Sequence, residues 1–258
     1  MATGVLPIAV GRATKIISSL PDKPKKYTAI VKFGMTSDTL DITGKILNTS
    51  DKKTYIDEIK SVIPNFLGEI EQLPPMYSAV SQNGQRLYDL ARKGKTVERK
   101  KRHIKIYSID LIDFDKENQE LEMSVECSKG TYIRSLADDI GKELGCGGLL
   151  KSLRRDETNG INLEECIDLD YLKTCDNPEK YLIPCEKFYE DWRKLKLSKF
   201  LTRLYINGVK LTTDECNLKN AVPGENLAVY SDEGIFIGTA IIDTSGEKIL
   251  HGQTVNLL

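Results

Sequence analysis

Residues 121–145 read LEMSVECSKGTYIRSLADDIGKELG, and they place a strand, a turn and a helix in direct succession. Apolar and polar side chains alternate over residues 121–127, which is typical of a strand with one buried face. Beyond Gly130 the apolar positions fall at the spacing i, i+3, i+4, i+7, i+11, so they share one face of a helix. These positions are Ile133, Leu136, Ala137, Ile140 and Leu144. Residues 132–144 are therefore predicted to form an amphipathic helix that packs on a sheet.

The turn of this segment carries the first candidate site. Thr131 is placed to be the helix N-cap, and Lys129 adds positive charge near a helix N-terminus, where anions bind. Arg134 lies beside the apolar stripe, where its guanidinium can pair with a carboxylate. It can also be an ordinary arginine that extends past apolar surface into water, and the spacing alone favours this second interpretation.

Outward from this segment, residues 27–33 and 104–114 have the alternation of strands, and residues 13–20 and 85–91 are predicted to be short helices. Residues 55–70 have helical periodicity, which Pro64 must bend or end. From residue 195 onward, short apolar runs alternate with glycine turns, which indicates a small all-β module. The sequence thus predicts two domains, residues 1–193 and residues 194–258.

The composition excludes several classes of protein. The 258 residues are 40% hydrophobic and 29% charged, an ordinary globular balance. No apolar stretch is long enough to span a bilayer, and the N-terminal residues make a poor signal peptide, so a cytoplasmic protein is expected. The six cysteines form no CxxC pair and the two histidines lie far from them in sequence. Neither a metal site nor a disulfide framework is expected.

Positive charge gathers in one segment, although the whole chain has a net charge of −1. Residues 86–105 contain nine basic and two acidic residues. Such a segment attracts polyphosphate, but it is also compatible with a solvated loop that binds nothing. Tyr77, in a proline-preceded loop beside it, can stack on an unpaired base or anchor the loop. Tyr27 lies on the apolar face of its strand, where a core tyrosine is the default interpretation.

Several ordered motifs resemble one family. Residues 2–8 read ATGVLPI and residues 11–15 read GRATK, which is similar to the second half of G-G-T-L-D-P-x-A-T-G-x-L-P-I followed by G-x-A-T-K. Residues 34–44 resemble G-x-x-T-D-T-x-D-x-x-G, and residues 75–94 resemble P-x-Y-S-A-x-K-x-x-G-x-x-x-Y-x-x-A-R-x-G. Residues 127–155 resemble C-S-K-G-T-Y-I-R, then G, L-G and L-R-R. This order is that of the TruB family of pseudouridine synthases, whose bacterial members modify uridine-55 of tRNA.

The resemblance implies an α/β (α+β) fold with a mixed, mostly antiparallel sheet, packed helices and a small C-terminal all-β, PUA-like domain. It implies a monomer that isomerises uridine in the T-arm of tRNA after flipping the base, without metal or cofactor and without a membrane. Arg134 would pair with the catalytic aspartate. Tyr27 would stack on the uracil and help remove the C5 proton, for which it would need a charged neighbour.

The resemblance assigns further residues to RNA. Tyr132, Leu153, Tyr77 and Lys129 would bind the substrate. The RNA backbone would be held by Arg86, Arg92, Lys93, Lys95, Arg99, Lys100, Lys101 and Arg102. Asp38 and Asp41 would belong to a separate loop that faces RNA. The sequence departs from the family at Ser37, where threonine is usual, and at Ser81, where lysine is common.

The largest departure concerns the catalytic aspartate. Met1 matches the variable position of L-D-P-x-A-T-G, so the aspartate would lie two residues before it and is expected to be missing from the chain. It could act as a nucleophile at C1′ or as a base at C2′. Three interpretations remain open: a synthase whose recorded start is truncated, an RNA-binding or tRNA-folding protein without catalysis, and a gene fragment without function.

Overall fold

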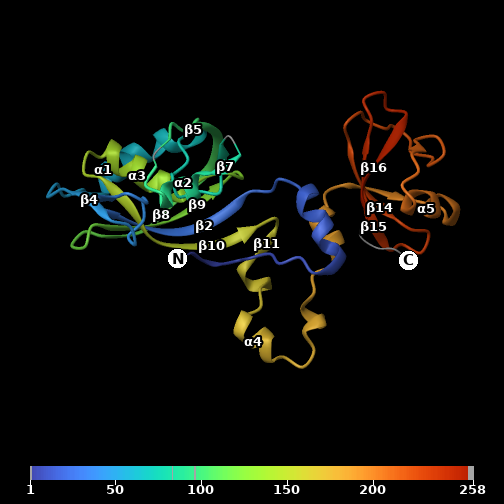
Figure 1. The fold of residues 1–258 in the computed structure, drawn as a ribbon, viewed down its shortest axis with the longest axis horizontal. Helices are drawn as coiled ribbons and strands as arrows, with labels where there is room; N and C mark the ends of the chain where they lie inside the picture. Colours follow the sequence, from blue (N-terminus) through green and yellow to red (C-terminus); the bar gives the residue numbers. More distant parts are fainter. Residues whose placement is uncertain (1, 83, 96, 255–258) are drawn as a thin grey trace. The chain divides into compact units, whose positions relative to one another are not determined.

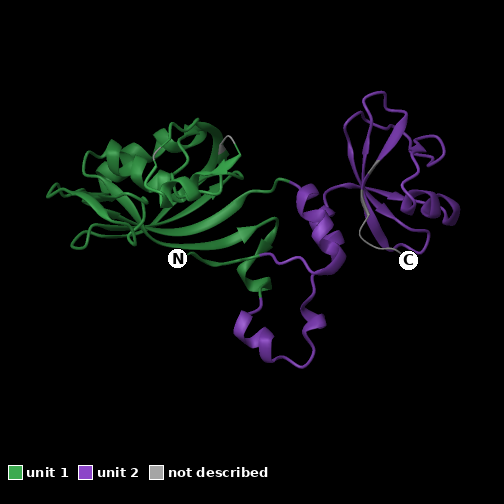
Figure 2. Cartoon of the chain, viewed as in Figure 1, with its two compact units in different colours: residues 1–6, 22–166 green, residues 7–21, 167–258 purple. Residues whose placement is uncertain are grey.

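The computed structural model describes residues 2–82, 84–95 and 97–254, and the chain forms two compact units (Figure 2). Unit 1 comprises residues 1–6 and 22–166, and unit 2 comprises residues 7–21 and 167–258. Met1 and residues 255–258, the ends of the two expected domains, lie outside the described residues. The division falls after residue 166, whereas the sequence predicted it after residue 193.

Unit 2 includes residues 7–21 because this segment buries apolar surface there. Its 3₁₀ helix η1 (Gly11–Ser19) contributes Ile16, which packs in one cluster with Tyr189, Ala228 and Phe236. The hydroxyls of Ser19 and Tyr189 lie 3.1 Å apart. No local pattern in residues 7–21 indicates a partner that is 170 positions further along the chain.

Unit 1 is built on a seven-stranded sheet with the order β1-β10-β2-β9-β8-β5, in which β11 also pairs with β10 (Figure 1). The strands are β1 (Ala2–Gly4), β2 (Lys25–Phe33), β5 (Gly68–Gln72), β8 (Arg102–Asp115), β9 (Glu120–Cys127), β10 (Gly148–Thr158) and β11 (Ile161–Asn162). Only β1 and β10 run parallel, and the other pairs are antiparallel. The mixed, mostly antiparallel sheet is confirmed.

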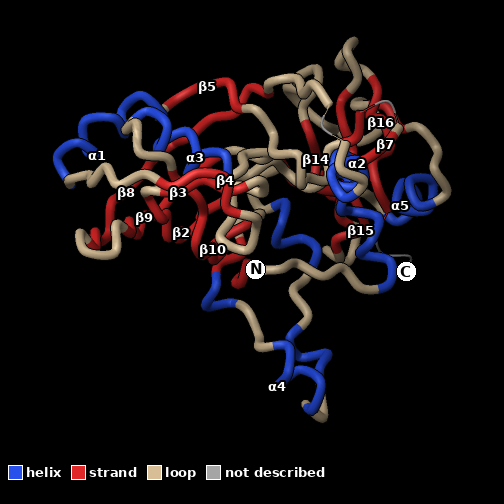
Figure 3. Tube along the Cα trace, turned by 60° about the vertical axis from the view of Figure 1, so that its left-hand side comes forward, coloured by secondary structure: helices blue, strands red, loops and turns tan. Residues whose placement is uncertain are grey.

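The helices α1 and α3 of unit 1 lie along one face of this sheet (Figure 3). The helix predicted over residues 132–144 is α3 (Ile133–Glu143), but its N-cap is Tyr132 and not Thr131, whose hydroxyl donates to the carbonyl oxygen of Ser128. The smaller elements are α1 (Ile56–Val62), η2 (Ile63–Phe66), η3 (Leu163–Glu165), α2 (Leu87–Arg92), β3 (Met35–Ser37), β4 (Ile46–Thr49), β6 (Ser81–Gln82) and β7 (Gln85–Arg86). Pro64 opens η2, so the helical run ends early and β5 follows.

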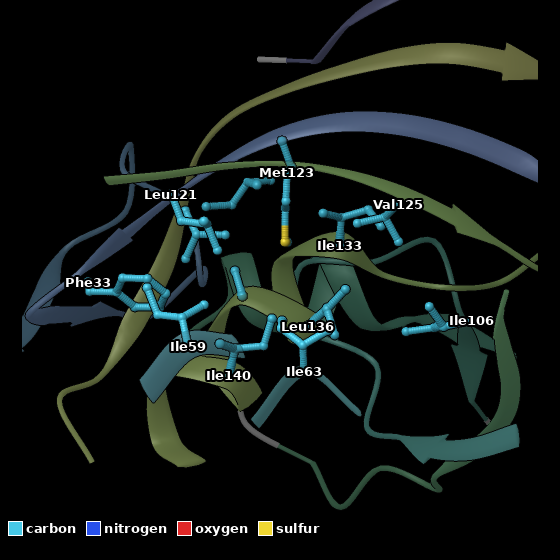
Figure 4. Close-up of a cluster of buried hydrophobic side chains, with 14 of the residues drawn as sticks. Phe33, Ile59, Ile63, Ile106, Leu121, Met123, Val125, Ile133, Leu136 and Ile140 are labelled. Atoms are coloured by element: carbon cyan, nitrogen blue, oxygen red, sulfur yellow. The ribbon is translucent and has the colours of Figure 1, made fainter. Parts of the chain in front are cut away.

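The core of unit 1 lies between α3 and the sheet (Figure 4). Leu136 and Ile140 of α3 face Leu121 and Met123 of β9, and all four are almost completely buried. Burial of each such side chain contributes about 1.5–3 kcal/mol. This packing fixes the start of α3 against β2 and β10, which is where the candidate site lies.

Unit 2 is rich in strands but is not purely β. Its five-stranded sheet has the order β12-β14-β15-β16-β13. The strands are β12 (Arg193–Lys196), β13 (Leu211–Thr212), β14 (Asn226–Tyr230), β15 (Phe236–Ile242) and β16 (Lys248–Thr254). It also contains α4 (Leu169–Thr174), η4 (Pro178–Tyr181), η5 (Cys185–Tyr189) and α5 (Lys199–Ile206), and α5 buries Tyr205 in the sheet's apolar cluster. The described residues contain no helix long and apolar enough to cross a membrane.

Candidate active site

A pocket of about 310 Å³ opens in unit 1 where α3 begins beside β2 and β10. Four residues to which the family resemblance gave a role in the site all line it: Tyr27 from β2, Tyr132 and Arg134 at the start of α3, and Leu153 from β10. Its remaining lining residues are Ala2, Asp41, Thr131, Ile133, Leu150, Lys151 and Ser152. Tyr27 and Leu153, which are 126 positions apart in the chain, therefore share one cavity.

Tyr27 reaches the pocket from the buried face of β2, where it packs against the core. Burial raises the pKa of its phenol above the ordinary value, and the positive charge of Arg155 acts in the opposite direction. The charged neighbour that the sequence reasoning required is thus present. Burial outweighs it, so Tyr27 is a neutral phenol at neutral pH.

Arg134 binds two loops through its guanidinium. Its Nη2 donates to the carbonyl oxygen of Tyr77 at 2.6 Å, and its Nη1 donates to that of Thr39 at 3.3 Å. The side chain is half-buried. The spacing had favoured an arginine that extends into water, and the structure differs from that interpretation. The side chain joins the segments around residues 39 and 77 to the wall of the pocket.

The start of α3 is held in place by a residue that the sequence reasoning missed. The buried side chain of Gln72 accepts a hydrogen bond from the Tyr132 amide at 2.8 Å. It also donates one to the Tyr132 carbonyl oxygen at 3.1 Å. The last residue of β5 thereby satisfies backbone groups at the N-terminus of α3. A lone glutamine at the end of a strand carries no sequence signal for this contact.

Asp41 lines the pocket, which corrects the expectation that its loop is separate from the site. The loop is bound to β10 on both sides of this residue. The Leu150 amide donates to the Leu40 carbonyl oxygen at 3.1 Å, and the Ile42 amide donates to the Leu150 carbonyl oxygen at 2.9 Å. The Oδ1 of Asp41 accepts from the amide and hydroxyl of Thr43. Asp38 instead accepts from the Lys45 amide and shapes the loop.

Two of the predicted substrate-binding residues do not line the pocket. Lys129 is exposed and pairs with Asp22 at 3.0 Å. The ring of Tyr77 packs edge-on against Tyr88, with centroids 6.3 Å apart, and the guanidinium of Arg92 lies 5.5 Å from the Tyr88 centroid. Tyr77 remains linked to the site through its carbonyl oxygen, which Arg134 holds.

The basic segment, here residues 86–102, is largely exposed. Seven of the eight predicted RNA-backbone residues have exposed side chains, and Arg99 is half-buried because its Nη1 donates to the Pro74 carbonyl oxygen at 2.8 Å. Lys101 pairs with Glu71 at 3.4 Å, where solvent screens the interaction. Most of this positive charge therefore faces solvent.

Over the described part of the chain, no three His, Cys, Asp or Glu side chains gather as a metal site would require.

Two family models match consecutive parts of the chain. The N-terminal domain of the TruB family of pseudouridylate synthases matches residues 1–133, and the C-terminal domain of tRNA pseudouridylate synthase B matches residues 134–188. The tRNA pseudouridine synthase B of Clostridium kluyveri is 43% identical over 242 residues, which are 92% of this chain and 81% of that protein. Its counterpart in Clostridium perfringens is 41% identical over 249 residues, 96% of this chain and 84% of that protein.

Solved structures share the fold. A Cbf5-Nop10-Gar1 complex contains a chain that matches all of this one over 72% of its own length, with a TM-score of 0.68 and 22% identity. An H/ACA ribonucleoprotein bound to a substrate RNA containing 2′-deoxyuridine gives a TM-score of 0.69 at 19% identity, over 73% of its chain.

The fold and the matching sequences define the class as RNA-modifying isomerases that form pseudouridine. Within that class, the chain belongs to the TruB family of pseudouridylate synthases.

Proposed function

We propose that this protein isomerises uridine-55 in the T-arm of tRNA to pseudouridine, as a cytoplasmic monomer without a cofactor. The observation that carries the proposal is the shared pocket of Tyr27, Tyr132, Arg134 and Leu153. Its volume of about 310 Å³ lies at the small end of the range typical of small-molecule sites, which suits a single base and its ribose. Flipping a base out of its stack costs a few kcal/mol, and stacking on an aromatic ring offsets about 1–3 kcal/mol of that cost.

The reaction needs a carboxylate at the ribose, and we propose that it comes from an aspartate outside these 258 residues. The bond from N1 of uracil to C1′ breaks, the base turns, C5 bonds to C1′, the C5 proton leaves and N1 gains a proton. Arg134 would hold the aspartate ionised and aimed. The raised pKa of Tyr27 supports stacking as a neutral phenol, because its phenolate is scarce at neutral pH.

Asp41 is a poor substitute for that aspartate. Of the described residues that line the pocket, Asp41 is the one carboxylate, and its Oδ1 already accepts two hydrogen bonds from Thr43. We therefore propose that the 258-residue chain by itself does not form pseudouridine.

The proposed substrate is tested by mapping pseudouridine in tRNA transcripts. The protein, extended before Met1 by Gly-Gly-Thr-Leu-Asp-Pro, is incubated with a full-length transcript and with the same transcript carrying cytidine at position 55. Modification at position 55 alone is expected, and none in the cytidine transcript. Modification at other uridines with position 55 untouched would contradict the proposed substrate.

A second candidate function is RNA binding without catalysis. It is favoured by the exposed basic segment together with the engaged carboxylate of Asp41. Binding of tRNA by the extended protein without any modification would support this candidate. A chain that neither folds nor binds RNA would instead indicate a fragment without function.

A further inference from the structure

Arg155 lies at the centre of the site's supporting strands, although it does not line the pocket. It stands on β10, directly opposite Tyr27 of β2 on one side and opposite Gly4 of β1 on the other. Residues directly opposite each other in a sheet pair point to the same face, so the side chains of Arg155 and Tyr27 are neighbours. The side chain is half-buried.

Arg155 and Val5 form a closed pair of hydrogen bonds. The Nε of Arg155 donates to the Val5 carbonyl oxygen at 2.7 Å, and the Val5 amide donates to the Arg155 carbonyl oxygen at 2.8 Å. Val5 is 2% exposed, so these bonds are shielded from water. At Gly4 the backbones approach so closely that a Cβ would lie 2.2 Å from the Arg155 carbonyl oxygen. Residues 2–4 pair with β10 along the strand, and Arg155 extends this attachment to Val5.

The same guanidinium reaches the pocket through Tyr27. It stands beside Tyr27 across the β2–β10 pairing, where its positive charge lowers a pKa that burial raises. The planar guanidinium has five N–H donors in a fixed arrangement, so one side chain can serve Val5 and Tyr27 together. A lysine at this position would keep the charge, but its single ammonium group could not reach both Val5 and Tyr27 in the way that the planar guanidinium does.

We propose that Arg155 is a positioning residue: it fixes residues 2–5 to β10 and orients the Tyr27 hydroxyl at the pocket. The inference deepens the proposed function, on which it rests, because it concerns the same cavity. Ala2 and Tyr27 both line that cavity, so Arg155 sets the relative placement of two of its walls.

The test uses the RNA-free 258-residue chain labelled with 3-fluorotyrosine and with ¹⁵N. Tyr27→Phe assigns the Tyr27 fluorine signal, whose position is followed against pH, and hydrogen exchange is measured at the Val5 amide. The variants are Arg155→Gln and Arg155→Lys. The matched control is Arg154→Gln, because Arg154 is the exposed neighbour whose Nε pairs with Asp156 at 2.5 Å.

In Arg155→Gln the Tyr27 signal should titrate at higher pH than in the parent, and the Val5 amide should exchange at least tenfold faster. Arg155→Lys should show a smaller displacement of the titration but the same faster exchange. Arg154→Gln should match the parent in both readouts. Unchanged titration and exchange in Arg155→Gln would overturn the proposal.

The test does not depend on the folding of Arg155→Gln or on the presence of RNA. Should Arg155→Gln fail to fold, Arg155→Lys and the parent's own Nε–H signals decide: the Nε–H of Arg155 must exchange more slowly than that of Arg154, and equal rates overturn the proposal. No RNA enters these measurements, so their failure is distinguishable from a failure of the proposed pseudouridine chemistry.

Discussion

The guanidinium of Arg134 and the carbonyl oxygen of Tyr77 are joined by a 2.6 Å hydrogen bond that spans 57 positions of the chain. A second bond from the same guanidinium reaches Thr39. A residue that faces the pocket thus also anchors two loops, one of which leads into the basic segment. One side chain therefore joins the wall of the pocket to both loops.

Replacing Arg134 by lysine is expected to release both loops while the fold persists. Lysine keeps the charge but cannot donate in two fixed directions. A hydrogen bond from a charged group contributes about 1.5–3 kcal/mol. Amides in residues 39–42 and 76–79 should exchange with solvent at least tenfold faster, measured by mass spectrometry of peptides. Lys142→Arg, on the exposed part of α3, is the control and should leave both loops unchanged; equal protection in the two variants would argue against the anchoring role.

The buried thiol of Cys127 should make the free energy of unfolding fall at alkaline pH. Burial raises the pKa of its thiol from 9.0 to about 11, so the folded state holds the proton more tightly than the unfolded state. The resulting stabilisation is full below pH 9 and is lost as the pH rises towards about 11. Two pKa units correspond to about 3 kcal/mol. Urea unfolding at pH 7.5 and 10.5 should show that the free energy of unfolding falls less in Cys127→Ala than in the parent. An equal fall in the two proteins would disprove the role of Cys127.

Gly141 permits the close approach of α3 to the chain that enters β10. A Cβ at this position would lie 2.2 Å from the Gly148 nitrogen and 2.3 Å from the Gly147 carbonyl carbon. These are backbone atoms, so no flexible side chain can move aside. Gly141→Ala should lower the free energy of unfolding by about 3 kcal/mol, although alanine is the better helix former. Glu143→Ala, exposed at the end of the same helix, should change it by less than about 0.5 kcal/mol in urea titrations; similar values for both would refute the packing argument.

The basic segment should determine the salt dependence of tRNA binding. Each phosphate contact contributes about −0.7 to −0.9 to the slope of log K against log salt concentration. The triple variant Lys93→Gln, Lys95→Gln, Lys100→Gln should therefore flatten the slope by up to about 2–3 units. Lys53, Lys60 and Lys116, exposed elsewhere in unit 1, provide a control triple to glutamine that should change it much less. An equal effect of both triples would mean that this segment has no special part in binding.

The sequence predicted what local periodicity encodes. The helix predicted over residues 132–144 is α3, which begins and ends one residue inside that range. Its apolar spacing repeats over three turns, so local periodicity is enough to place it. The assignment of Tyr27 and Arg134 to one site came from family motifs and not from the spacing of residues. Asp41, Gln72 and Arg155 could not be placed, because each acts through a contact with a residue 60 or more positions away. Such pairings leave no local pattern.

We predict that this pocket isomerises uridine once an aspartate stands before residues 2–5. The measurement is tritium release from a tRNA transcript carrying C5-labelled uridine. Three proteins are compared: the 258-residue chain, the chain preceded by Gly-Gly-Thr-Leu-Asp-Pro, and the same extension with asparagine in place of the aspartate. Release is predicted for the aspartate extension alone. Release by the 258-residue chain itself, or equal release by the asparagine extension, would contradict the account.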